Sequence, residues 1–138
     1  MLLERFYEDG LAQASYLVGC QATGEALVVD PVRDVEQYVA AAEREDLSIV
    51  AATETHIHAD FLSGVRELGE RLGARMLLPG EGGEGWEYEY ADEGEARLLR
   101  DGDTFRLGNV RFQALHTPGH TPEHVSLLLT DGAASEEP

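Results

Sequence analysis

Short apolar runs separated by turn-forming residues predict a domain that begins with β-strands. Strands are expected over residues 3–7, 14–18 and 26–29, because each run has the length and composition of a strand. The pairs Asp9-Gly10 and Thr23-Gly24 mark the turns between them. This order indicates an antiparallel meander.

The middle of the chain alternates between strand-like and helix-like spacing of apolar residues. Asp34 is expected to cap a helix, and the continuous apolar run 47–53 predicts a strand buried on both faces. A second helix over 62–72 should end at Gly73 in a left-handed cap, before a strand over 74–78. The β-α-β-α-β order predicts parallel pairing of these strands.

The last third of the chain reads as a loop followed by a second group of strands. Residues 81–95 are rich in glycine and acidic side chains, which predicts a loop. Strands at 105–107 and 110–112 are expected to form a tight hairpin across Gly108-Asn109. A final strand is predicted over 125–129.

Composition narrows the class of protein. With 138 residues and 43% hydrophobic content, the chain should fold as one domain over residues 1–130, followed by a polar tail at 131–138. Ten basic and 27 acidic residues give a net charge of −17, which disfavours nucleic acid and anionic membranes as partners. A single cysteine, Cys20, excludes an internal disulfide and suits a reducing compartment. Because neither a secretory signal nor a membrane-spanning run is found, we expect a cytoplasmic protein.

All five histidines lie in two short segments, each after a predicted strand. If the chain stays extended past Thr53, His56, His58 and Asp60 would lie on one side of it. Imidazole and carboxylate groups together suit zinc, iron or manganese, and the lack of cysteine ligands argues against a closed structural zinc site. The clusters therefore predict a catalytic metal, although Asp60 alone would be read as a helix cap. The second cluster holds His116, His120 and His124.

These motifs carry a resemblance to a known family. The pattern Thr-His-x-His-x-Asp at residues 55–60 resembles the first metal motif of the metallo-β-lactamase superfamily. The stretches ETHIHADFLSG, LHTPGHTPEH and SLLLTDG are similar to its persulfide dioxygenase branch, in particular to members that carry rhodanese domains after the catalytic domain. The resemblance implies an α/β fold, the four-layer αββα sandwich, of which this chain would be the N-terminal half.

The branch also implies a site. It uses one Fe(II) held by two histidines and an aspartate, and the matching histidines are His56 and His120. His58 and Asp60 then orient the ligands or contact the substrate. The implied reaction oxidises glutathione persulfide, or another low-molecular-weight persulfide, with O2 to sulfite and thiol. Phe61 stands where the dinuclear zinc hydrolases, such as glyoxalase II, place another histidine ligand.

The sequence departs from the family pattern in one respect. The family's remaining carboxylate ligand comes from a Gly-Asp segment in the second half of the sandwich, and Asp131 is not at that position. We therefore expect the chain to be a fragment, or to be completed by another chain, including a second copy. The resemblance implies an enzyme, but two alternatives stay open: a zinc-dependent thioester hydrolase like glyoxalase II, and a non-catalytic module that associates with another chain.

Overall fold

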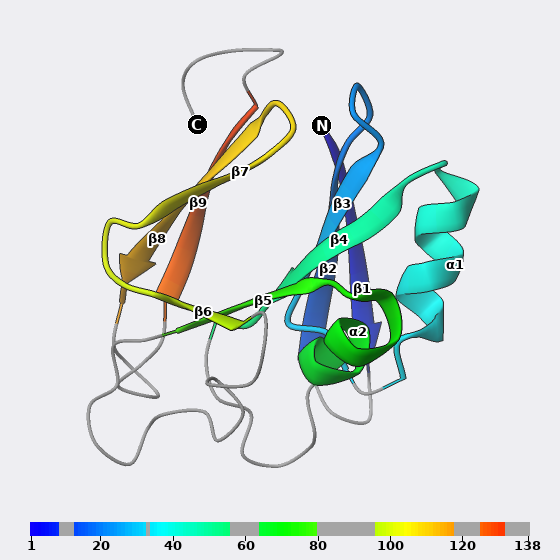
Figure 1. The fold of residues 1–138 in the computed structure, drawn as a ribbon, viewed down its shortest axis with the longest axis horizontal. Coiled ribbons are helices and arrows are strands. Elements are labelled where there is room, and N and C mark those ends of the chain that lie inside the picture. Colours follow the sequence, from blue (N-terminus) through cyan, green and yellow to red (C-terminus); the bar gives the residue numbers. More distant parts are fainter. Residues whose placement is uncertain (9–12, 33, 56–63, 80–95, 118–124, 132–138) are drawn as a thin grey trace.

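The computed structural model describes residues 1–8, 13–32, 34–55, 64–79, 96–117 and 125–131, which form two helices and two sheets (Figure 1). The first sheet has the order β1-β2-β3-β4-β5-β6, and the second has the order β7-β8-β9. Both helices cover one face of the first sheet, and the second sheet lies against its other face (Figure 1). The elements are β1 (Leu2–Glu8), β2 (Gln13–Cys20), β3 (Glu25–Val29), α1 (Glu36–Arg44), β4 (Ser48–Thr53), α2 (Gly64–Leu72), β5 (Arg75–Pro79), β6 (Ala96–Leu99), β7 (Thr104–Leu107), β8 (Val110–His116) and β9 (Val125–Asp131).

Pairing in the first sheet agrees with the predicted order. β1, β2 and β3 pair antiparallel, as expected for a meander, whereas β3, β4, β5 and β6 pair in parallel. Two apolar clusters hold the layers together. Tyr38 of α1 and Leu68 of α2 are buried against the helix-facing side of the sheet. Leu27, Leu77 and Phe112 belong to the second cluster, which lies between the two sheets.

The local predictions hold at most boundaries and fail at three. Gly73 has φ +68° after α2, as the predicted cap requires. Asp34 is not the N-cap: the cap position is Val35, which is buried, and Asp34 instead accepts a 3.3 Å hydrogen bond from the Glu36 N–H. β9 continues to Asp131, one residue into the predicted tail. The predicted loop over 81–95 and the rest of the tail lie outside the described residues.

The third failure concerns the strand before the first histidine cluster. β4 ends at Thr53, and the chain bends at Thr55, so the extended conformation does not run on to His56. Its burial is also less complete than predicted, since Ser48 is exposed and Val50 is half-buried. His56, His58 and Asp60 themselves lie outside the described residues, so their placement on one side of the chain stays a prediction.

The β7–β8 hairpin joins the two sheets through its turn. Gly108 has φ +56° at the first of the two turn positions, where type II′ turns require glycine. The Asn109 N–H donates a hydrogen bond to Cys20 Sγ at 3.3 Å, which lowers the pKa of this thiol. A methyl group on Gly108 would overlap Thr23 Oγ1 and would lie 2.6 Å from Cys20 Sγ. The turn is thus packed tightly against the β2–β3 connection.

Gly108→Ala is expected to lower the free energy of unfolding by about 2–4 kcal/mol, because it adds a steric overlap to a backbone conformation that disfavours side chains. Gly102→Ala is a matched control, since Gly102 has φ +86° but no atom within 4 Å of the added methyl. The control should lose only about 1 kcal/mol. Urea denaturation measures both, and equal losses would show that the contact with Cys20 and Thr23 has no energetic importance.

Candidate metal site

The strands that lead into the two histidine clusters end at the same end of the sandwich. β3, β4 and β8 all run toward the lower edge in Figure 1, where β9 begins. His56, His58, Asp60 and His120 lie outside the described residues. The structure therefore defines how the bases of the two loops are held. It brings these bases to one end of the molecule, as a shared metal ion requires.

The first loop is anchored by the Asp30 carboxylate. The Asp30 N–H donates to the Thr53 carbonyl at 2.8 Å, which extends the pairing of β3 with β4. Its Oδ1 accepts the Thr55 N–H at 2.8 Å, and its Oδ2 accepts the Thr55 hydroxyl at 2.7 Å. Both carboxylate oxygens are thus bound to the residue directly before His56. Hydrogen bonds to a charged group contribute about 1.5–3 kcal/mol each, so this anchor fixes the start of the loop firmly.

The backbone at Asp30 is strained, which indicates that its position matters. Asp30 has φ +52°, a left-handed conformation that costs a non-glycine residue about 1–2 kcal/mol. The residue is nevertheless buried, with 7% of its surface exposed. In this conformation the carboxylate makes both hydrogen bonds to Thr55, which offset the strain.

Tyr38 holds the chain just after Asp30. Its hydroxyl accepts the Val32 N–H at 2.9 Å and shares a 2.8 Å hydrogen bond with Ser15 Oγ. The ring is fully buried and packs nearly perpendicular to the Phe6 ring, with 5.1 Å between the two ring centroids. Burial raises the pKa of Tyr38 above its ordinary value, so the hydroxyl stays protonated at neutral pH. β2 and α1 are therefore both tied to the segment that carries the anchor.

Two further polar residues lie at the end of β4. Thr53 is fully buried, and its hydroxyl donates to the Leu77 carbonyl at 2.5 Å, which ties the end of β4 to β5. Glu54 follows and is also fully buried. An acidic side chain is seldom buried completely unless it interacts with other groups. Its position next to Thr55 places this acid at the base of the first histidine loop.

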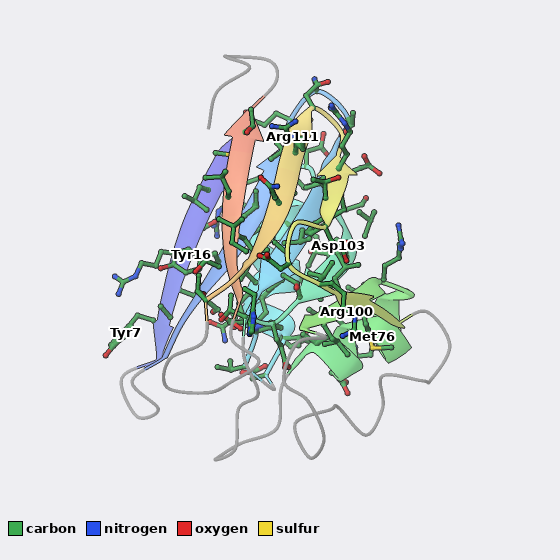
Figure 2. All side chains as sticks on the ribbon, turned by 90° about the vertical axis from the view of Figure 1, so that its left-hand side faces the viewer. Tyr7, Tyr16, Met76, Arg100, Asp103 and Arg111 are labelled. Carbon is green, nitrogen blue, oxygen red and sulfur yellow. The ribbon has the colours of Figure 1, made fainter. Side chains whose placement is uncertain are left out.

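The second loop is anchored in a similar way. Asp101 Oδ1 accepts the N–H of His116, the last residue of β8, at 2.8 Å. The turn that carries Asp101 is itself stabilised by a hydrogen bond from the Arg100 N–H to Asp103 Oδ2 at 2.8 Å. Figure 2 labels Arg100 and Asp103. Across the loop, Thr117 Oγ1 and Ser126 Oγ share a 2.9 Å hydrogen bond. The loop that contains His120 is therefore closed at its base on both sides.

Sequence reasoning identified the histidines but missed the acidic residues at the bases of their loops. Asp30, Glu54 and Asp101 were not singled out, although Asp30 directly follows an apolar strand, which is a usable signal. Within the described part of the chain, no three His, Cys, Asp or Glu side chains form a group able to hold a metal. The predicted donors all lie in the two loops, outside this part of the chain, and imidazole and carboxylate donors of this kind suit iron or zinc.

The fold and these loop bases define a class: a layered α/β domain with histidine-bearing loops at one end of a two-sheet sandwich. The model of the metallo-β-lactamase superfamily matches residues 9–132. The chain belongs to this superfamily. Its α/β metallo-β-lactamase fold, predicted from the motifs, is confirmed.

Three proteins of known structure or function are similar to this chain over nearly its whole length. A metallo-β-lactamase structure from Staphylococcus aureus subsp. aureus COL is 45% identical with a TM-score of 0.92, and the match covers 97% of this chain and 40% of that chain. The human persulfide dioxygenase ETHE1, mitochondrial, is 32% identical over 133 residues, covering 95% of this chain and 49% of the relative. The hydroxyacylglutathione hydrolase of Nitrosococcus oceani is 33% identical over 130 residues, covering 93% and 47%. The chain thus spans about half the length of the curated relatives it matches.

Each described helix has nine residues, and none in the described part of the chain is long and apolar enough to cross a bilayer.

Proposed function

We propose that the chain is the N-terminal half of an iron-dependent persulfide dioxygenase that oxidises glutathione persulfide, or a similar small persulfide, with O2. The observation that carries this proposal is Phe61, which occupies the position where the two-metal hydrolases of the superfamily place a histidine. A phenyl ring cannot coordinate a metal, so a second ion would lack a ligand there. The human persulfide dioxygenase, which is 32% identical to this chain, supports the proposal.

His56 and His120 would hold the iron, and the chain's other residues would position them. Asp30 fixes Thr55 next to His56, and Asp101 fixes the end of the strand that leads to His120. When bound, a redox-active iron supplies the electron chemistry that zinc lacks, and the overall reaction converts persulfide, O2 and one water to thiol and sulfite.

His58 and Asp60 are proposed to orient the two histidine ligands or to contact the persulfide, since ligands of this kind need hydrogen-bond partners. The family's third ligand, a carboxylate, has no match in these 138 residues. Activity is therefore proposed only for a complete site that includes this third ligand. A partner chain is one source of the missing carboxylate.

A second function is favoured by a specific observation. The hydroxyacylglutathione hydrolase of Nitrosococcus oceani is as similar to this chain as the human dioxygenase is. A zinc-dependent hydrolase of glutathione thioesters would share the fold and the glutathione moiety of the substrate. It would differ in the metal and in having no use for O2.

The test uses the full chain as its gene encodes it, loaded without oxygen with either Fe(II) or Zn(II). We expect O2 uptake and sulfite release with glutathione persulfide for the iron form only, at one iron per chain. Hydrolysis of a hydroxyacylglutathione by the zinc form, without O2 uptake by the iron form, would replace this proposal with the hydrolase. A stable dimer that binds neither metal would identify a non-catalytic module.

A further inference from the structure

Glu54 is the most deeply buried acidic side chain among those that the structure describes. Only two described acidic side chains are buried, Asp30 with 7% of its surface exposed and Glu54 with 0%. The Oε2 atom of Glu54 has no contact with solvent. A carboxylate removed from water in this way needs hydrogen-bond donors around it. The backbone N–H and the hydroxyl of Thr55 both bind Asp30, so the donors for Glu54 come from another segment.

The alternation of β4 places Glu54 on the helix-facing side of the first sheet. Ala51 belongs to the cluster between the two sheets, and Ala52 belongs to the cluster under the helices. Thr53 and Glu54 continue this alternation, because successive side chains of a strand point to opposite faces. Glu54 directly follows the last residue of β4, before the bend at Thr55. Its side chain is therefore directed to the face that the helices cover.

The start of α2 lies on this face and at the same end of the sheet. α2 packs against β4 and β5, and Figure 1 shows it beside the lower end of the first sheet. Leu72 ends α2, with two residues between it and Arg75, the first residue of β5. Because β4 and β5 are parallel, the other end of α2 lies toward the carboxyl ends of both strands. Val65 in the first turn of α2 is fully buried, as Glu54 is, so both lie in the same buried layer.

The first turn of a helix is a suitable partner for a buried carboxylate. Its backbone N–H groups have no acceptor within the helix, and the helix dipole adds partial positive charge there. The position along the chain gives such a contact a consequence. α2 begins at Gly64, directly after the first histidine loop, so its first turn is the far end of that loop.

We propose that Glu54 is a positioning residue of the metal site, whose carboxylate accepts backbone N–H groups from the first turn of α2. Asp30 holds the beginning of the first histidine loop through Thr55, and Glu54 holds its end. The two acids together fix both ends of the segment that carries His56 and His58. The contact is inferred from burial and topology alone, whereas its effect on the metal rests on the proposed function.

Hydrogen exchange of the metal-free full chain, followed by NMR, tests the contact. The N–H of Val65 is expected to exchange about tenfold faster in Glu54→Ala than in the unchanged chain, because it loses its acceptor. Glu54→Gln keeps one acceptor oxygen and should retain part of this protection. Glu43→Gln makes the same chemical change at an exposed position of α1 and is the matched control. The control should leave the exchange of Val65 unchanged.

Affinity for Fe(II), measured by competition with a fluorescent chelator, tests whether the contact positions the loop. Glu54→Ala is expected to weaken Fe(II) binding by about tenfold, Glu54→Gln by less, and Glu43→Gln not at all.

Three results would overturn the proposal: unchanged exchange of the Val65 N–H in Glu54→Ala, equally faster exchange throughout α1 and α2, or unchanged Fe(II) affinity in that variant. The second result would mean a general loss of stability and not the loss of one contact. A full chain that bound no metal at all would refute the proposed function instead, and the exchange data would still decide whether the contact exists.

Discussion

His56→Ala and His120→Ala are each expected to reduce the metal content of the full chain to less than about a tenth of its original value, and its activity by more than about 100-fold. The two residues belong to loops that follow β4 and β8, and these strands end together at one end of the sandwich (Figure 1). If both imidazoles bind one ion, removing either of them leaves a site whose affinity is too low to retain the metal. Metal analysis by mass spectrometry after desalting measures the loss.

His124, which belongs to the same cluster as His120, provides the control for this experiment. His124→Ala changes a side chain that the sequence assigns to no metal role, so it should keep the metal. If only one of His56→Ala and His120→Ala lost metal, the two loops would not share an ion. If His124→Ala lost as much metal as His120→Ala, the assignment of the ligand within the second loop would be wrong.

Asp30→Asn is expected to weaken metal binding by about 10- to 100-fold and to lower the free energy of unfolding by about 1–3 kcal/mol. Its carboxylate accepts two hydrogen bonds from Thr55, at 2.8 and 2.7 Å, and an amide can accept only one of them. Asparagine tolerates the φ of +52° at this position, so the substitution adds no backbone strain to the measured changes in metal affinity and stability. Competition with a fluorescent chelator measures the affinity of the folded protein for the metal.

Asp34→Asn is a control of the same chemistry four positions further along the chain. Asp34 is exposed, and its carboxylate accepts one long hydrogen bond, 3.3 Å, from the Glu36 N–H. Its replacement should change stability by no more than about 0.5 kcal/mol and leave metal affinity unchanged. Unchanged metal affinity in Asp30→Asn would show that the anchor supports the fold without positioning the first loop.

The elements that depend on local chemistry could be predicted from the sequence. Gly73 ends a helix, and Gly108-Asn109 forms a tight hairpin, because positive φ values favour glycine whatever the rest of the molecule does. Helix α1 was predicted too early because Asp34 is a good capping residue. Burial of Val35, at 2% exposed, places the cap at Val35 instead. Tertiary packing thus overrode local preference.

The candidate site could also be predicted only in part, because some of its residues are defined by local sequence and others by long-range pairing. Side-chain type and spacing single out His56, His58 and Asp60, whereas His120 is chosen among the later histidines by the resemblance to the superfamily. The described residues do not test the roles of these four side chains. The anchor of Asp30 on Thr55 joins residues 25 positions apart. It depends on the register of β3 against β4, which includes a shift between Ala26 and Leu27. Neither register nor shift is written in local sequence patterns.

The most direct test of the account is a crystal structure of the iron-loaded full chain, with anomalous diffraction recorded at the iron edge. We expect one iron peak within bonding distance of a ring nitrogen of His56 and of a ring nitrogen of His120. Two metal peaks, or a single peak that touches only one of the two loops, would contradict it.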